Sequence, residues 1–597
     1  MNTCLSINHG EKGFDLPTYR PSQRAWEVLK AGGIMAEGET LSGFFERVIS
    51  ALFSVEQQFG TPAAETKRVA EAFAGLMVEN YVMPGTPLLT NAGRNEAALS
   101  SCVVLPFELR AYDAESERTI CAYYRQNMGA GFDFTPYKDP LALLCWLNEL
   151  CVRESATGLY DRYIGNMGML HISHPCVAEF SAAKRWRNLK HFNISIDVSE
   201  AFMQRAQQGE SFELANRQRI NAAELLRHIA EHAWLNGDPG LLFLERMNRD
   251  NPVSALSSYA GTPPCAEMGL AGGETCHFGY INLSKLVRSN GEHVELDYDM
   301  LGRVTILLTR VLDNAVEYSL ARFPADLSRD IAMQNRKIGI GVCGLAEMLL
   351  AFGLPYDAPE ARLLARDVLS FITFKSKWAS VELAEQRGSC LAMQERSLNR
   401  YLNGSHLEEK YGARPTNTVT AADWEELARR IRETGHLRNI TTTALPPTGR
   451  AALLVDTTSA IEPFFSIFTQ ENTLQPAMVA ALARALEGNP QQTELLEQVC
   501  REASKAGSFQ GIDVLPEYVR WCLRTAKEIE PQAHIQMVAD VAGLHGVTDE
   551  AASKTVNLPH ETTIEDVEAV LFSAFEHGLK NIAVYRDGSY VGQPMTL

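Results

Sequence analysis

The sequence predicts a mixed α/β fold that follows a helical N-terminal region. From about residue 192 onward, short runs rich in β-branched and aromatic residues alternate with longer amphipathic segments, which is the pattern of an α/β architecture. Residues 192–198 predict a strand and residues 199–208 a helix. Residues 336–342 predict another strand, followed by a helix over residues 345–352. The chain therefore alternates strand and helix over most of its 597 residues.

The first eighty residues carry apolar side chains at three- and four-residue spacing, which predicts helices. The predicted helices span residues 22–31, 41–59 and 63–77. We find no internal repeat, low-complexity tract or interdomain linker. The simplest organisation is a helical N-terminal region over residues 1–80 and one large catalytic domain over residues 81–597.

The segment between these two parts contains proline, glycine and asparagine at high density. Residues 83–93 therefore predict a loop. It leads to Ser100, Ser101 and Cys102, and the apolar run 103–105 that follows predicts a strand.

Composition excludes several functional classes. The sequence has 55 Lys and Arg against 73 Asp and Glu, so its formal net charge is -18. A surface of this sign repels phosphate backbones and disfavours binding of a nucleic acid polymer, but it leaves room for a small anionic substrate in a local pocket. Residues 1–14 lack the apolar core of a signal peptide, and no run approaches about 18 apolar residues. We therefore expect no membrane association and a cytoplasmic protein.

Twelve cysteines are distributed along the chain without any C-x-x-C motif. This distribution disfavours a zinc ribbon and a dense disulfide framework, and in a reducing compartment most of the thiols should be free. We must therefore identify from the sequence which of the twelve cysteines take part in chemistry.

The stretch of residues 262–267, TPPCAE, is the strongest candidate. Two consecutive prolines stiffen the backbone before Cys265. In an extended chain, residues two apart face the same side, so we expect the thiol of Cys265 beside the carboxylate of Glu267. The alternative is that Cys265 is a small buried apolar residue and Glu267 a surface acid.

Eight segments, one of which contains this stretch, decide between these alternatives when they are taken in order. They are MPGTPLLTNAG (83–93) with LSSC (99–102), GFDF (131–134), HFNISIDVSEAFM (191–203), GDPGLLFLERMNRDNP (237–252), PPCAEMGLAGGETCHFGYINL (263–283), NRKIGIGVCG (335–344), PPTGR with TTSAIEP (446–463) and GLKNIAVYRDGS (578–589). With them the chain resembles the catalytic subunit of ribonucleotide reductases over nearly its whole length, and most closely the adenosylcobalamin-dependent class II enzymes. The resemblance implies a ten-stranded α/β barrel with the cysteine loop at its centre.

The resemblance implies a role for each reactive residue. Cys265 would carry the thiyl radical that abstracts the ribose 3′ hydrogen, and Glu267 would be the base for the 3′-hydroxyl proton. Cys102 and Cys276 would form the dithiol that reduces the 2′ carbon and becomes a disulfide, since removal of a C–OH group needs two electrons that two thiols can supply.

The resemblance also implies a substrate-binding set. Pro447, Thr448, Gly449 and Arg450 precede an apolar helix-forming run, and a helix N-terminus suits a phosphate. The alternative is that these residues only cap that helix. The remaining members are Thr86, Ser100 and Ser101, which would lie beside the nucleotide.

The radical needs a source, and the resemblance implies adenosylcobalamin. Class I enzymes use a pair of adjacent tyrosines near the C-terminus, where this chain has Ala583, Val584 and Tyr585. The glycyl-radical class needs its own glycine motif, which the surroundings of Gly592 do not match. Adenosylcobalamin is the remaining source.

Four departures from the family pattern affect the expected activity. Pro263 stands in place of a ribose-binding asparagine, and Arg450 in place of a threonine or serine. Residues 134–161 form a shorter stretch than the one that carries allosteric and dimer contacts in the family. The sequence also ends without a cysteine-pair tail, so we expect an external, thioredoxin-type dithiol reductant. Whether the chain forms a homodimer stays open.

Two other functions remain as alternatives. One is a radical enzyme that modifies a nucleotide in another biosynthetic pathway, for which Pro263 and Arg450 would reshape the pocket. The other is a non-enzymatic nucleotide-binding paralogue. Two further motifs carry little weight: the G-x-G-x-x-G of residues 339–344 lacks a surrounding βαβ unit, and the His171, His174, Cys176 and Glu179 group fits no standard zinc spacing.

Overall fold

The computed structural model describes residues 19–31, 33–94, 97–106, 113–155, 163–289 and 293–589. The predicted N-terminal helices are confirmed as α1 (Gln23–Ala31), α2 (Leu41–Phe53) with the 3-10 turn η1 (Ser54–Phe59), and α3 (Ala63–Val78). Helices α2 and α3 pack on the long helix α12 (Tyr298–Leu320) and share one hydrophobic core with the strands. The domain boundary at residue 80 stays a prediction.

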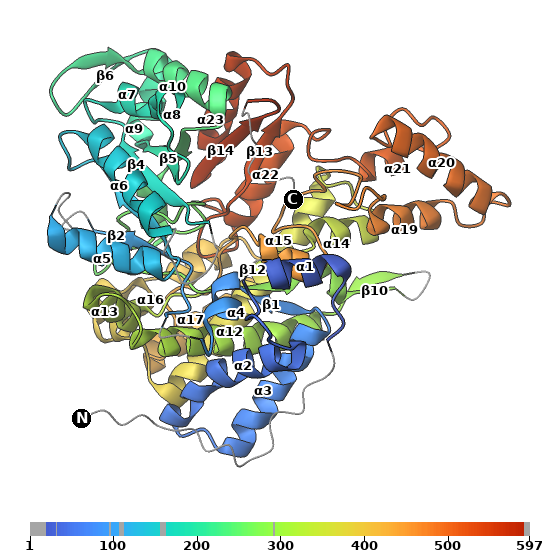
Figure 1. The fold of residues 1–597 in the computed structure, drawn as a ribbon, viewed down its shortest axis with the longest axis horizontal. Coiled ribbons are helices and arrows are strands. Elements are labelled where there is room, and N and C mark those ends of the chain that lie inside the picture. Colours follow the sequence, from blue (N-terminus) through green and yellow to red (C-terminus); the bar gives the residue numbers. More distant parts are fainter. Residues whose placement is uncertain are drawn as a thin grey trace.

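The larger sheet has seven strands in the order β13-β14-β8-β5-β4-β3-β2. Figure 1 shows β13 and β14, from the C-terminal part of the chain, beside β4 and β5. Strands β2, β3, β4, β5 and β8 run parallel to one another, whereas β14 is antiparallel to β8 and parallel to β13. The strand bounds are β2 (Cys102–Leu105), β3 (Gly129–Asp133), β4 (Asn166–His171), β5 (Phe192–Asp197), β8 (Gly240–Leu242), β13 (Thr555–Leu558) and β14 (Asn581–Arg586). On β5, Phe192, Ile194 and Ile196 are buried on one face, while Asn193 and Asp197 lie on the other.

The smaller sheet has three strands in the order β1-β9-β12. Strand β9 (Phe278–Asn282) lies at its centre, antiparallel to β1 (Val82–Pro84) and parallel to β12 (Gly339–Cys343). Helix α12 covers β9 and β12. Two hairpins, β6 (Ser211–Glu213) with β7 (Arg219–Asn221) and β10 (Val287–Ser289) with β11 (Val294–Leu296), lie outside the two main sheets.

The α/β class is confirmed, but the described strands do not form the closed ten-stranded barrel that the resemblance implies. The seven-stranded and three-stranded sheets are joined at their edges only by isolated bridges. One bridge pairs Val103 with Thr275, and two others pair Ile340 with Thr443 and Leu445 with Ala552. Pro446 and Pro447 follow the bridge at Leu445 and have no N–H to extend a ladder, so pairing of this segment stops there.

Two local predictions were wrong. The predicted loop 83–93 contains β1 and helix α4 (Thr86–Asn91), because Pro87 occupies the first turn of a helix, where a missing N–H costs nothing. The predicted strand 336–342 begins only at Gly339, since Arg336 has a φ of 46° and ends helix α13 (Asp326–Asn335).

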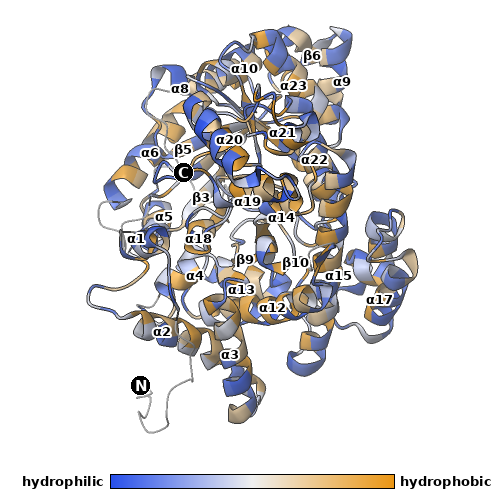
Figure 2. Ribbon diagram, turned by 90° about the vertical axis from the view of Figure 1, so that its right-hand side faces the viewer, coloured by the Kyte–Doolittle hydropathy of each residue, from blue (hydrophilic) through white to orange (hydrophobic). Residues whose placement is uncertain are grey.

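The remaining helices cover the two sheets and form one lateral projection. The projection consists of α19 (Pro476–Ala485), α20 (Gln492–Ala506) and α21 (Glu517–Cys522), whose apolar cluster also includes Ala346 and Leu350 of α14 (Figure 1). In Figure 2 most of the α20 ribbon that faces the viewer has the colour of hydrophilic residues. The other helices are α5 (Ala114–Arg125), α6 (Pro140–Ser155), α7 (Val177–Ser181), α8 (Ala183–Trp186), α9 (Glu200–Gln208), α10 (Ala222–Asn236), α11 (Leu244–Asp250), α14 (Leu345–Ala351), α15 (Pro359–Arg387), α16 (Arg400–Asn403), α17 (Ala421–Thr434), α18 (Arg450–Leu454), α22 (Pro531–Ala542) and α23 (Ile564–Glu576). Within the described ranges, no helix combines the length and the apolar character needed to cross a membrane.

Candidate active site

The candidate site is built around a loop whose two arms pair at Gly261 and Leu270. At its tip the N–H of Ala266 donates to the carbonyl of Pro263 at 3.0 Å, which closes a turn with Pro264 at its second position. Proline favours that position because its φ is already near the required value. Cys265 is exposed at the turn, whereas its neighbours on both sides are buried.

The turn corrects the prediction of an extended backbone through residues 262–267. Cys265 is exposed and Glu267 only 3 % exposed, so the two side chains do not share one face of a strand. The alternative of a buried Cys265 with a surface Glu267 is contradicted as well, because the structure shows the reverse. Ala266 has a φ of 58°, a left-handed conformation that costs a residue with a Cβ about 1–3 kcal/mol.

Two glycines of β3 let this loop lie directly against the sheet. A Cβ added at Gly131 would lie 2.1 Å from the carbonyl oxygen of Thr262. A Cβ added at Gly129 would lie 3.1 Å from Cγ of Pro264 and 3.3 Å from Sγ of Cys102. Because glycine has no side chain, the cysteine turn can approach β3 closely at these two positions and lies next to Cys102.

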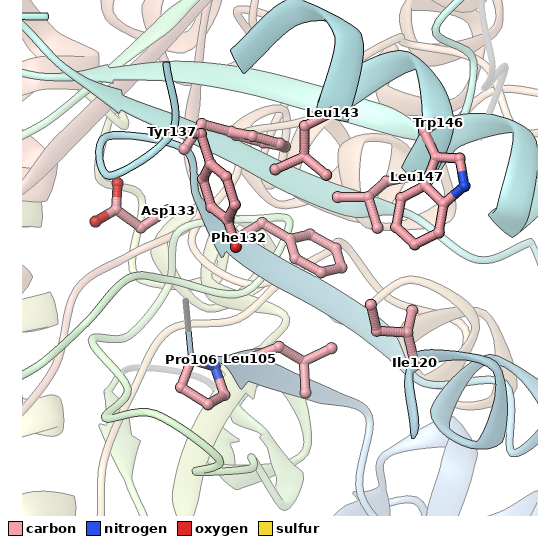
Figure 3. Close-up of a pocket in the computed structure, with 10 residues that line it drawn as sticks. Leu105, Pro106, Ile120, Phe132, Asp133, Tyr137, Leu143, Trp146 and Leu147 are labelled. Carbon is pink, nitrogen blue, oxygen red and sulfur yellow. The ribbon is translucent and has the colours of Figure 1, made fainter. Parts of the chain in front are cut away.

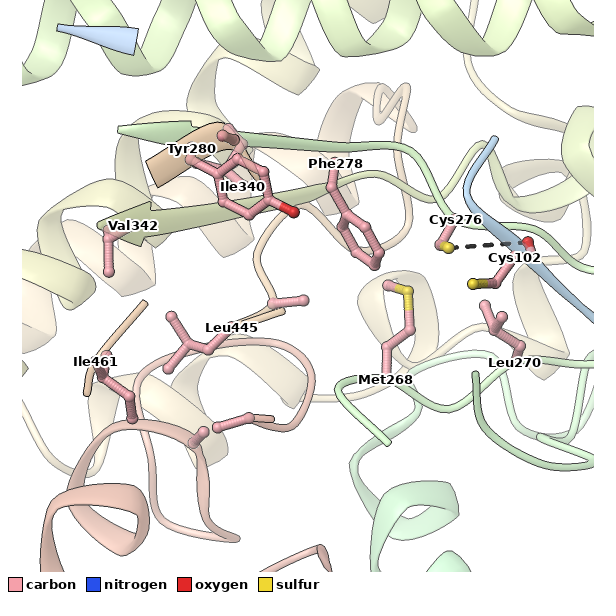
Figure 4. Close-up of a cluster of buried hydrophobic side chains, with 14 of the residues drawn as sticks. Cys102, Met268, Leu270, Cys276, Phe278, Tyr280, Ile340, Val342, Leu445 and Ile461 are labelled. Carbon is pink, nitrogen blue, oxygen red and sulfur yellow. Dashed lines mark hydrogen bonds between the residues drawn. The ribbon is translucent and has the colours of Figure 1, made fainter. Parts of the chain in front are cut away.

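Cys102 and Cys276, 174 residues apart in sequence, meet where β2, the edge strand of the larger sheet, lies beside the segment that leads into β9. Cys102 begins β2, and Cys276 lies two residues before β9. The N–H of Cys276 donates to the carbonyl of Cys102 at 3.3 Å, and its thiol approaches the same oxygen at 3.8 Å (Figure 4). Burial raises the pKa of the Cys276 thiol well above its usual value, and the neighbouring Cys102 and Glu267 add to this shift. Both cysteines are thiols, which is the form that a two-electron reductant requires.

Glu267 is a carboxyl group held in the protein interior beside this dithiol. Burial raises its pKa to about 7, and Oε2 has no hydrogen-bond partner. A group with this pKa can accept a proton near neutral pH. The structure therefore brings together Cys102, Cys276 and Glu267, with Pro264 of the Cys265 turn packed against the same corner.

The predicted phosphate segment contacts β9 at the central residue of the strand. The hydroxyl of Tyr280 on β9 donates to the carbonyl of Pro447 at 3.2 Å, and the N–H and hydroxyl of Thr448 both bond Oγ of Ser459. Gly449 has a φ of 49° with open space around its Cα, and half-buried Arg450 begins α18. Strand β9 thus connects the dithiol to this segment.

The other predicted substrate residues lie near the same strand. Half-buried Thr86 begins α4, directly after Gly85, whose N–H donates to the carbonyl of Phe278 at 2.8 Å. Ser100 is buried, and its hydroxyl donates to the carbonyl of Cys276 at 2.9 Å, so it also braces the dithiol. The N–H of Ser101 donates to the same carbonyl at 3.1 Å.

Sequence reasoning missed four residues that hold the site together. Ser459 and Tyr280 hold the phosphate segment, and the side chains of Asn193 and Asn581 bond the carbonyls of Pro264 and Ala266. All four lie within the segments that carry the family resemblance. Their order in the sequence contains no signal that pairs them with these partners.

The two remaining motifs, the G-x-G-x-x-G segment and the histidine group, lie outside the candidate site. Gly339 to Cys343 form the buried strand β12, and Gly344 leads into α14. His171 bonds Oγ of Ser173, and His174 bonds the carbonyl of Tyr137. Figure 3 shows an apolar hollow between β2, β3, α5 and α6 that none of the predicted site residues lines.

Comparison with known proteins agrees with this geometry. The profile of the ribonucleotide reductase barrel domain matches residues 138–585. The chain belongs to the ribonucleotide reductase family. It is 32% identical over 94% of its length to a protein of Mycobacterium tuberculosis named vitamin B12-dependent ribonucleoside-diphosphate reductase, of which 77% is covered. A protein of the same name from Thermoplasma acidophilum is 30% identical over 96% of this chain and 71% of its own length.

The fold is also that of a solved structure. The Actinobacillus ureae class Id ribonucleotide reductase alpha subunit matches with a TM-score of 0.72 and 17% identity, over 95% of this chain and 98% of that one. At this identity the match concerns the fold alone.

Proposed function

We propose that the chain is an adenosylcobalamin-dependent ribonucleotide reductase that converts ribonucleotides into 2′-deoxyribonucleotides. The observation that carries the proposal is the placement of exposed Cys265 on a turn packed beside the buried dithiol Cys102/Cys276 and the carboxyl group of Glu267. The relatives named vitamin B12-dependent reductases support the choice of cofactor.

Each residue has one chemical role in this proposal. The Cys265 thiyl abstracts the 3′ hydrogen of the ribose and returns it after reduction, so Cys265 is unchanged over a cycle. Glu267 accepts the proton of the 3′-hydroxyl. The two thiols supply two electrons and two hydrogens: the C2′–OH bond breaks, a C2′–H bond forms, water leaves and Cys102 and Cys276 become a disulfide.

The residues present fit the proposed cofactor. Among the cysteines that the structure describes, Cys265 is the exposed one, so its sulfur is accessible to a bound group. When bound, adenosylcobalamin supplies the radical that converts the Cys265 thiol into a thiyl.

The partners follow from the same chemistry. A disulfide formed in each cycle must be reduced again, for which we propose a thioredoxin-type or other external dithiol. The substrate is a ribonucleoside di- or triphosphate rather than a nucleic acid polymer. A cytoplasmic location and a homodimer complete the proposal.

Anaerobic incubation of the protein with adenosylcobalamin, a dithiol and each common ribonucleoside di- or triphosphate tests this function. We expect a 2′-deoxynucleotide from at least one of them. Absence of deoxynucleotide from all of them would reject the proposal.

The same incubation tests a second candidate, a radical enzyme that rearranges or dehydrates a nucleotide. Pro263 favours this candidate, because its backbone carbonyl closes the cysteine turn and its side chain offers no ribose hydrogen bond. A new product formed without dithiol consumption, either an isomer of the substrate or a product lighter by one water, would support it over reduction.

Replacement of Arg450 by alanine should weaken substrate binding. A charged hydrogen bond to phosphate contributes about 1–3 kcal/mol, which corresponds to roughly a 5- to 150-fold rise in the Kd of the nucleotide. Equilibrium binding of a ribonucleotide to the wild type, R450A and R450K measures this effect, with R450K retaining part of the affinity. Equal affinity of the wild type and R450A would place Arg450 outside the phosphate site.

Activity should depend on the protonation of Glu267. Because a base must be deprotonated and burial raises the pKa of Glu267 to about 7, kcat/KM should rise with pH up to about 7 and then level off. In E267Q the rate should fall by roughly 10²–10⁴-fold and this rise should disappear. Single-turnover rates of the prereduced protein measure the rate loss and the pH dependence. No external dithiol is then present whose own ionisation would change with pH.

Thermal or denaturant unfolding provides an independent control. The folded state retains a proton on Glu267 up to about pH 7, whereas the unfolded chain releases it near the usual value of 4.5. The free energy of unfolding should therefore decrease by up to about 3 kcal/mol between these pH values, and E267Q should lack this decrease. The same pH dependence in both proteins would contradict the burial of this carboxyl group.

A further inference from the structure

The cysteine loop is anchored firmly at its base. The N–H of Gly269 donates to Oε2 of Glu550 at 3.2 Å, and Nζ of Lys337 donates to the carbonyl of Gly269 at 2.6 Å. Lys337 and Glu550 form a buried ion pair at 2.8 Å, and Tyr259 donates its hydroxyl to the same carboxylate. Backbone groups near the base are thus bonded to buried charged side chains from other parts of the chain.

The tip of the loop is held differently, by two carboxamides. Nδ2 of Asn193 on β5 donates to the carbonyl of Pro264 at 2.9 Å. Nδ2 of Asn581 on β14 donates to the carbonyl of Ala266. These two carbonyls belong to the residues immediately before and after Cys265.

Both asparagines project from one face of the seven-stranded sheet. Asn193 is paired in register with Met167, and Asn581 with Leu242, which in turn pairs with Asp197. Asn193 and Asp197 are four residues apart on β5 and therefore share a face. Ala266 packs in one apolar cluster with Met167, Met169 and Leu242 on that face. The loop tip therefore lies between two donors fixed in the same sheet.

We propose that Asn193 and Asn581 form a clamp that positions Cys265 for hydrogen transfer. The clamp is needed because Ala266 holds a φ of 58°, a conformation that persists only where contacts impose it. The hydrogen bond from the Ala266 N–H to the Pro263 carbonyl helps to impose this conformation. The carboxamides of Asn193 and Asn581 impose it as well, from either side of Cys265. Hydrogen transfer is sensitive to displacements of about 1 Å, so a loosened turn should lose rate rather than substrate affinity. The inference rests on the proposed role of Cys265.

Exchange of each amide for a carboxylate tests the clamp. N193D and N581D keep the size of the side chain but replace the donor by an acceptor that faces a carbonyl oxygen. Hydrogen exchange of the protein without cofactor or nucleotide should be at least about tenfold faster in the peptide that covers residues 262–268, because the turn opens more often. Peptides from β5 and β14 should exchange as in the wild type. N399D is the matched control, since Nδ2 of Asn399 donates to the carbonyl of Ala392 in a separate apolar cluster.

Kinetics of the complete system add a second measurement. N193D and N581D should lower kcat by roughly 10- to 100-fold with the nucleotide KM unchanged, and N193Q, which keeps the donor, should retain more activity than N193D. Asn193 is exposed, so N193D carries the test alone if N581D does not fold. Unchanged exchange at residues 262–268, or exchange that is faster throughout the molecule, would overturn the clamp. A wild type without deoxynucleotide formation would reject the proposed function instead, because the exchange measurement needs no turnover.

Discussion

Replacement of Cys265 by serine should abolish turnover. The serine hydroxyl fits the exposed position on the turn, but its hydrogen is bound too strongly to make it a radical carrier. We expect a loss of roughly 10³-fold or more in deoxynucleotide formation, the scale seen when a residue on which the chemistry depends is removed. Because Cys265 is exposed, the free energy of unfolding should change little. Product analysis and denaturant unfolding of C265S measure the two effects.

C500S is the matched control for this change. Cys500 is partly exposed on α20, in the lateral projection, and takes no part in the candidate site. It should retain full activity. Sustained multiple turnover by C265S would refute the assignment of Cys265 as the radical site.

Replacement of Cys102 or Cys276 by serine should separate reduction from radical formation. Either change removes one of the two thiols that supply electrons, so continuous formation of deoxynucleotide should stop. Cofactor cleavage depends on Cys265 and should continue when nucleotide is added. Absorbance of the cofactor and product analysis on the same sample distinguish the two steps.

C343S serves as the control for a buried thiol. Cys343 ends β12 and is as deeply buried as Cys276, but its thiol faces the carbonyl of Ile281. It should retain reductase activity per folded molecule. Repeated turnover by C102S and C276S with an external dithiol would show that another thiol pair reduces the substrate.

Hydrophobic periodicity predicted the local elements with good accuracy. Residues 41–59 and 63–77 form α2 with η1 and α3, and residues 192–198 form β5, because their apolar spacing matches the faces they bury. Periodicity failed where backbone geometry dominates. The left-handed conformation of Arg336 shortens one predicted strand, and the turn from Pro263 to Ala266 replaces a predicted extended segment.

The candidate site could be predicted only in part. The order of the motifs placed Cys102, Cys265, Glu267 and Cys276 in one site, but it did not show that Cys265 is exposed while Glu267 is buried. That contrast depends on Pro264 in the turn and on packing against the side-chain-free positions of β3. Long-range bonds such as that from Asn581 to Ala266, 315 residues apart, are set by sheet register, which the sequence pattern does not specify.

A single turnover with location of the disulfide tests the central claim most directly. The prereduced protein is mixed anaerobically with adenosylcobalamin and a ribonucleotide, without external dithiol, and its thiols are then alkylated and mapped by mass spectrometry. We expect one deoxynucleotide for each disulfide between Cys102 and Cys276, with Cys265 still a thiol. Deoxynucleotide formed while Cys102 and Cys276 both remain thiols, or a disulfide that includes Cys265, would contradict the proposed roles of these three cysteines.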